Sequence, residues 1–171
     1  MLQRAHLSDR HFYLRWLAAS AVVLGLTLLA PSAGAAPEPW VVSRKEVGAA
    51  FPHAEVFFDT TLALDFATAQ TPAMAARFTP LRRLSYNKRP VPGAVWVRFA
   101  IANREAVPLD RVLVVDNRSV DELDVWLDDS AGAWAHYNSG QNVPVSERII
   151  PTLTPMFPIK VAPGRSGRAH V

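Results

Sequence analysis

Two carboxylates near the middle of the chain, Glu122 and Asp124, stand two residues apart in a segment with strand-like alternation. Alternate residues of a strand share one face and lie ~7 Å apart, a separation that inverting glycosidases use. Charged residues on the solvent face of a strand are common, however, and Asp128 and Asp129 belong to a residue type enriched in turns. A solvated strand face explains these residues better, so we predict no catalytic residues and no enzyme.

The same acidic residues could also be read as a calcium site. Four aspartates would supply its carboxylates: Asp121, Asp124, Asp128 and Asp129. Ca²⁺ takes about six to eight oxygen ligands, but the spacing here matches no calcium-loop motif. The histidines after the N-terminal region also lack metal-ligand spacing: His53, His136 and His170. We therefore predict no metal site and no other cofactor.

Two tryptophans and a histidine are the candidate ligand-binding residues. Trp126 lies out of phase with the apolar residues of its strand, and Trp134 and His136 share one face of the strand that follows. A Trp on a polar sheet face can stack on a sugar ring and donate its indole N–H to a hydroxyl. Alternatively, the N-terminal segment or a second sheet covers this face and Trp126 is a core residue. The ligand hypothesis then moves to the loops around Asn117-Arg118 and Gln141-Asn142.

Period-two alternation after Gly93 predicts the strands that position these residues. One face of the strands is expected to form the core: Val95, Val97, Phe99, Ile101, Leu123, Val125 and Leu127. On the other face, Trp96 beside Arg98 is interpreted as structural. Residues 111–115 (RVLVV) fit a strand covered on both faces. Residues 156–161 fit an edge strand, because Pro158 cannot donate to a ladder.

Turn signals and one helix signal separate the strands. Residues 128–132 have the composition of a hairpin loop in which Gly132 supplies a positive φ. Thr71 as N-cap and Pro72 as first helical residue predict a short helix, the only one expected after residue 36. Residues 40–42 fit either a first short strand or a docking segment. Short strands with such turns indicate an antiparallel sandwich or barrel.

The N-terminus has the layout of a secretory signal peptide over residues 1–36. Arg4, Arg10 and Arg15 precede an apolar run at residues 17–30, and small residues follow it. The run is shorter than the ~20 residues that span a bilayer, so a retained anchor is the alternative rather than the preferred interpretation. We predict cleavage after Ala35 or Ala36, a linker over residues 37–53, and a periplasmic location.

Charge and cysteine content narrow the possible functions further. Removing residues 1–36 takes away three of the 18 basic and one of the 15 acidic residues, which leaves a net charge of +1. Such a balance gives no support for nucleic-acid binding. The chain contains no cysteine, which rules out disulfides and thiol catalysis.

Residues 54–171 resemble the extracellular type 2 domain of the seven-transmembrane receptors with diverse intracellular signalling modules. The residues that carry the resemblance occur in a fixed order: Phe78-Thr79-Pro80, Val95-Trp96-Val97-Arg98-Phe99 with Asn103, Val120 to Leu127 with Gly132, Tyr137-Asn138-Ser139-Gly140 with Pro144, and Phe157-Pro158-Ile159 with Pro163-Gly164. The resemblance implies an all-β fold, a jelly-roll-like antiparallel β-sandwich similar to carbohydrate-binding modules. It also implies seven following membrane helices and a diguanylate cyclase or histidine kinase output.

We therefore expect a periplasmic ligand-sensing domain at the front of a bacterial membrane receptor. Its partners would be a small-molecule or carbohydrate ligand and the membrane, through a C-terminal transmembrane region. Few residues follow the last turn at residues 163–167, so we interpret the chain as truncated at its last strand. The alternative is a freestanding secreted carbohydrate-binding protein, similar to a lectin.

Overall fold

The computed structural model describes residues 37–44, 48–81, 92–128 and 132–171, which belong to the unit Ala36–Val171. The predicted signal peptide and Asp129 lie outside the described residues. No helix within the described ranges is long and apolar enough to cross a membrane.

Most strands belong to one large sheet, whose members are β1 (Trp40–Val42), β2 (Ala54–Asp59), β3 (Thr79–Pro80), β4 (Ala94–Asn103), β6 (Leu123–Asp128), β7 (Trp134–Ser139) and β9 (Ser166–His170). Their order is β3-β2-β4-β9-β6-β7, and β1 pairs in parallel with the end of β4. A second, two-stranded sheet pairs β5 (Leu109–Val114) with β8 (Met156–Val161). All pairs except β1–β4 are antiparallel.

The core lies between the two sheets. Its buried members come from both: Val42, Ala54, Phe99, Ile101, Leu109, Leu113, Leu123, Val125, Leu127, Phe157, Ile159, Val161 and Ala169. This arrangement confirms the predicted antiparallel β-sandwich and the predicted inward face of β4 and β6. The jelly-roll topology stays a prediction.

Two predictions about strand burial are wrong. Val95 was expected in the core but is 52 % exposed. Its cross-strand neighbour Phe58 is similarly exposed, at 55 %. The cover that the two-stranded sheet gives to β4 ends short of this position. β5 was expected to be covered on both faces, yet Val112 and Val114 are about half exposed. The two-stranded sheet is the outer layer here, so β5 buries one face only.

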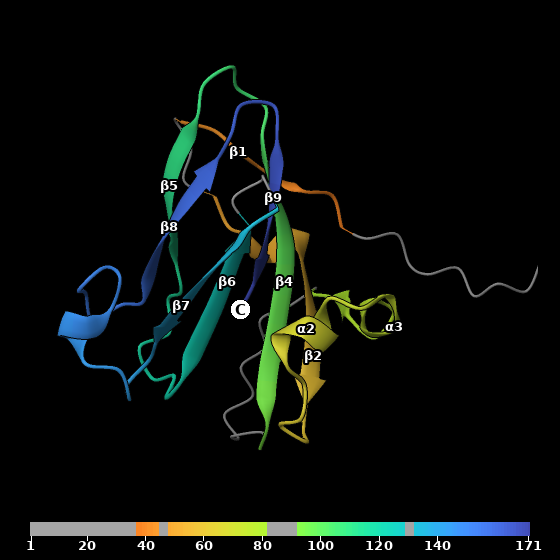
Figure 1. Cartoon of the computed structure of the whole chain (residues 1–171), viewed down its shortest axis with the longest axis vertical. Coiled ribbons are helices and arrows are strands. Elements are labelled where there is room, and N and C mark those ends of the chain that lie inside the picture. Colours follow the sequence, from red (N-terminus) through yellow and green to blue (C-terminus); the bar gives the residue numbers. More distant parts are fainter. Residues whose placement is uncertain (1–36, 45–47, 82–91, 129–131) are drawn as a thin grey trace, which may run out of the picture. The chain divides into compact units, whose positions relative to one another are not determined.

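Two short helices cover part of the other face of the large sheet. Helix α3 (Pro72–Ala75) begins as predicted, with the Thr71 hydroxyl accepting a hydrogen bond from the Met74 backbone N–H. Helix α2 (Phe66–Ala69) was not predicted; Asp65 caps it by accepting from the Thr68 N–H at 2.7 Å. Figure 1 shows both helices beside β2 and β4, away from β5 and β8. Single 3₁₀ turns occur at η2 (Phe51–His53) and η3 (Val145–Glu147).

The hairpin that joins β6 to β7 carries the predicted glycine. Gly132 has a φ of +99°, a value that favours glycine. Strand β8 contains Pro158 and, among the described strands, pairs with β5 alone, as expected of an edge strand. Strand β9 lies between β4 and β6 and pairs with both.

Candidate ligand-binding site

The β6–β7 pair brings Trp126 and His136 together on the face that α2 covers. They are register partners, and their rings stack with centroids 4.7 Å apart and planes 11° apart. On the other side of β6, Trp96 of β4 stacks against the same indole, 5.6 Å away at 13°. The strand order places His136 and Trp96 on opposite sides of Trp126, so both faces of this indole are in contact with a ring.

Phe66 of α2 completes this group. Its ring lies parallel to Trp126 at 4.8 Å and meets Trp134 edge-on at 5.0 Å. The structure thus gathers the three predicted residues Trp126, Trp134 and His136 around a side chain that sequence reasoning missed. We call Phe66, Trp96, Trp126, Trp134, His136 and His170 the aromatic cluster.

The cover over Trp126 is neither of those considered from the sequence. Trp40 and Val42 of the N-terminal segment pack against the core between the sheets, as does the second sheet. Trp126 itself is half-buried and packs against a separate small cluster of Ala69, Met74, Phe78 and Trp96. It therefore lies outside the main core and under α2.

Polar groups adjoin the aromatic cluster at its exposed end. His136 Nε2 lies 2.8 Å from Asp124 Oδ1, and Asn138 Nδ2 donates to the same oxygen at 3.1 Å. The side chains of His136 and Asp124 are 50 % and 41 % exposed. A shallow pocket of about 350 Å³ lies next to them, lined in part by His136, Asn138 and Glu147. An imidazole, an amide and a carboxylate side by side suit the hydroxyls of a polar ligand.

Like Phe66 and Trp96, His170 is a member of this cluster that sequence reasoning did not place there. It pairs with Trp126 across β9 and β6 and contacts Phe66 and Trp134 edge-on. Burial, followed by the charges of Arg98 and Arg168, lowers the pKa of His170 to about 4. Its imidazole is consequently neutral at pH 7. Among the described residues, its Nδ1 and Trp96 Nε1 are buried without a hydrogen-bond partner.

Trp96 and Arg98 are structural, as predicted. Trp96 is buried beneath the helices. Arg98 forms a 2.7 Å ion pair with Glu55 across the β2–β4 pair, lies over the Phe78 ring at 4.2 Å, and donates to the Ala75 carbonyl. These contacts hold α3 against the sheet.

The two carboxylates considered for catalysis, Glu122 and Asp124, each contact polar side chains of the neighbouring chain segments. Asp124 is occupied by His136 and Asn138, whereas Glu122 precedes β6 and faces Asn142 at 3.5 Å. Within the part of the chain that the structure describes, no group of three His, Asp or Glu residues could hold a metal ion.

The loops named as the alternative site do meet. Gln141 donates to the Arg118 carbonyl at 3.2 Å, and its backbone N–H bonds the Val120 carbonyl. Arg118, Gln141 and Asn142 are exposed and Asn117 is half-buried. None of the four lines the pocket beside His136.

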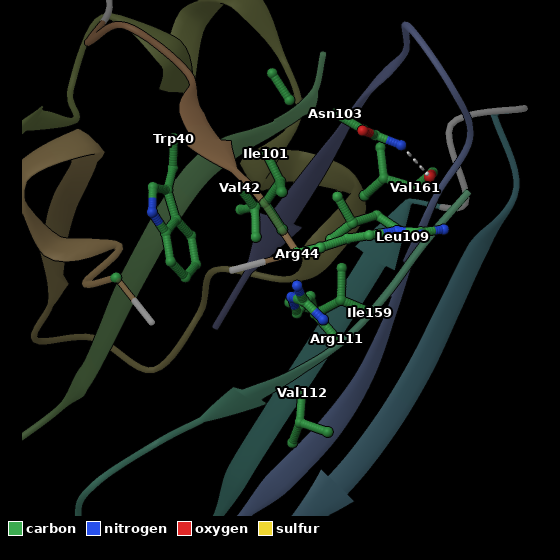
Figure 2. A pocket seen from close by; sticks show the side chains of 12 residues that line it. Trp40, Val42, Arg44, Ile101, Asn103, Leu109, Arg111, Val112, Ile159 and Val161 are labelled. Carbon is green, nitrogen blue, oxygen red and sulfur yellow. Dashed lines mark hydrogen bonds between the residues drawn. The ribbon is translucent and has the colours of Figure 1, made fainter. Parts of the chain in front are cut away.

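A second cavity, of about 250 Å³, lies between β1, β4 and the two-stranded sheet (Figure 2). Among its described lining residues, Arg44 and Arg111 are charged. Sequence reasoning missed this site, although one signal was present: in the period-two pattern Arg111 falls in phase with the buried Leu109 and Leu113.

Comparison with known proteins gives one match. The family model described as 7TMR-DISM extracellular 2 matches residues 52–170. No curated protein and no solved structure matches the chain.

Proposed function

The chain belongs to the 7TMR-DISM extracellular 2 family, and we propose that it is the periplasmic ligand-sensing domain of a bacterial membrane receptor. The observation that carries this proposal is the family match, which runs from η2 to β9 and so covers every strand of the sandwich that the structure describes except β1. Domains of this family are extracellular sensor domains of membrane receptors, which places the domain outside the cytoplasm. We further propose a diguanylate cyclase or histidine kinase as the output.

The ligand that we propose is a carbohydrate or another small polar molecule at the exposed end of the aromatic cluster. Asp124, His136 and Asn138 would bond its hydroxyls there, and Trp134 would supply apolar contact area. Trp126 would support His136 from behind, since the two rings stack.

A binding experiment tests this site. Neutral mono- and oligosaccharides are titrated calorimetrically against the wild-type protein, His136→Ala and Asn138→Ala. Because both side chains are exposed, the variants should fold normally and lose at least about tenfold in affinity, or ~1.4 kcal/mol. His53→Ala, a histidine on η2 away from the cluster, is the matched control. A saccharide that binds all four proteins equally would place the ligand elsewhere.

Export and receptor membership need separate tests. Mass spectrometry of periplasmic material should find a mature N-terminus at Ala36 or Pro37, and a chain beginning at Met1 would contradict cleavage. The open reading frame should continue beyond the codon for Val171 and encode hydrophobic helices. A stop codon without such helices would favour the freestanding carbohydrate-binding protein instead.

A further inference from the structure

We propose that the cavity between β1 and the two-stranded sheet is a second ligand site, which takes a small monocarboxylate with a short apolar tail. It is distinct from the aromatic cluster, because the two sets of lining residues share no member. The argument rests on the chemistry of the cavity wall and on the ionic state of its two arginines.

The inner wall of the cavity is apolar. Ile101, Leu109, Ile159 and Val161 line it, and each is at most 5 % exposed. Trp40 adds an aromatic ring, as Figure 2 shows. The volume, about 250 Å³, lies just below the ~300–1,000 Å³ of sites for drug-sized molecules, so a smaller ligand fits.

The charged part of the lining is basic. The described lining residues include two arginines and no carboxylate. Arg44 is neutralised by Glu105, which accepts from its backbone N–H at 2.9 Å and lies 3.5 Å from its Nε. Arg111 has no ion pair with any described carboxylate. The described lining residues therefore carry one positive charge that no described carboxylate compensates.

The Arg111 guanidinium is held in place but keeps donors to spare. Its Nε and Nη2 donate to the Ser43 carbonyl at 3.1 and 2.6 Å, and Nη1 donates to the Asp110 carbonyl at 3.2 Å. A guanidinium has five N–H groups, so two remain. A fixed, half-buried guanidinium beside an apolar wall is suited to a carboxylate, whose geometry it matches.

Hexanoate is the probe for the test, titrated against the full chain and monitored by NMR shifts and calorimetry. We expect saturable binding at least tenfold tighter than that of hexan-1-ol, which lacks the charge, or acetate, which lacks the tail. Arg111→Met should weaken hexanoate binding at least tenfold. Arg118→Met, an exposed arginine that bonds Thr154, is the matched control and should stay within twofold of wild type.

A second variant guards against a purely structural role of Arg111 as a strut to Ser43. Arg111→Lys keeps a positive charge at the cavity but removes the fork that donates twice to the Ser43 carbonyl. Arg111→Lys should therefore bind hexanoate more tightly than Arg111→Met. The proposal is overturned if the wild type does not bind hexanoate below ~10 mM, if hexan-1-ol binds equally well, or if folded Arg111→Lys and Arg111→Met bind hexanoate equally weakly.

Discussion

The indole of Trp126 and the imidazole of His136 lie parallel across the β6–β7 pair, 4.7 Å between centroids. With Trp96 stacked on the other side of the indole, a ligand at the aromatic cluster meets the edge of Trp126 rather than its face. The imidazole is also fixed by Asp124 at 2.8 Å. Trp126, which is half-buried, therefore supports the exposed ring of His136 from behind.

The first prediction concerns Trp126→Ala. Since the half-buried indole contacts three rings, its removal should lower the free energy of unfolding by ~2 kcal/mol, less than for a fully buried Trp. Trp126→Phe should lose ~1 kcal/mol or less, because a flat ring still fills the stack. Urea denaturation measures both. A Trp126→Ala protein as stable as wild type would mean that α2 does not pack on this residue.

The second prediction is that two residues on the same face of β4 differ in how much stability their truncation costs. Phe99 is 7 % exposed and contacts Trp40 edge-on at 6.3 Å, so Phe99→Ala should cost ~3–5 kcal/mol. Val95, four residues earlier on the same face, is 52 % exposed, and Val95→Ala should cost less than ~1 kcal/mol. Thermal and urea unfolding of the pair tests where the two-stranded sheet stops covering β4. Similar losses for both variants would show that its cover reaches Val95.

The sequence predicts the direction in which side chains point better than it predicts what covers them. Leu123, Val125 and Leu127 were placed correctly because a strand alternates with a strict period of two. Val95 obeys the same period, yet it is exposed, because the extent of the opposing sheet depends on residues far away in the sequence. Val112 was expected to be buried because it belongs to a continuous apolar run, but it lies on the exposed face of β5. The period of two therefore identifies which residues share a face of a strand. It does not show whether another element covers that face.

The candidate site shows the same limit. Trp126, Trp134 and His136 could be grouped from the sequence because one hairpin carries them all. Phe66 precedes Trp126 by 60 residues and belongs to a four-residue helix, which is too short to give a periodic signal. Arg111 was missed for another reason. Its phase with the buried Leu109 and Leu113 indicates that it faces inward, but the cavity beside it arises only from tertiary packing.

A third prediction concerns the glycine that precedes β4. Gly93 has a φ of +130°, and a Cβ there would overlap the Asp59 carbonyl oxygen. Gly93→Ala combines strain with a backbone clash and should cost ~3 kcal/mol or more. Gly164 is the control, since its φ of +63° lies in the left-handed region and a Cβ there meets nothing within 4 Å. Gly164→Ala should cost ~1 kcal/mol. Equal melting temperatures for the two variants would contradict the close approach at Asp59.

The last prediction is a loss of stability on mild acidification, caused by His170. Its backbone is fixed because the neighbouring Val171 exchanges two hydrogen bonds with Val97, at 2.7 and 2.8 Å. Burial first, and then Arg98 and Arg168, lower the pKa of His170 from 6.5 to about 4. Between these two values the unfolded chain binds a proton that the folded chain does not. Stability should therefore be full above pH 6.5, fall as the pH drops through this window, and lose nothing further from His170 below about pH 4.

From pH 7 to pH 5 the expected loss is ~2 kcal/mol. His170→Phe keeps an aromatic ring against Phe66 and Trp134 but cannot take up the proton, so its stability should change far less over the same range. The carboxyl groups of Asp59 and Asp65, whose pKa values are lowered chiefly by hydrogen bonds from Thr61 and Thr68 respectively, respond only at more acidic pH. Urea denaturation of both proteins at pH 7, 6 and 5 isolates the histidine, because parallel profiles would mean that folding does not shift the pKa of His170.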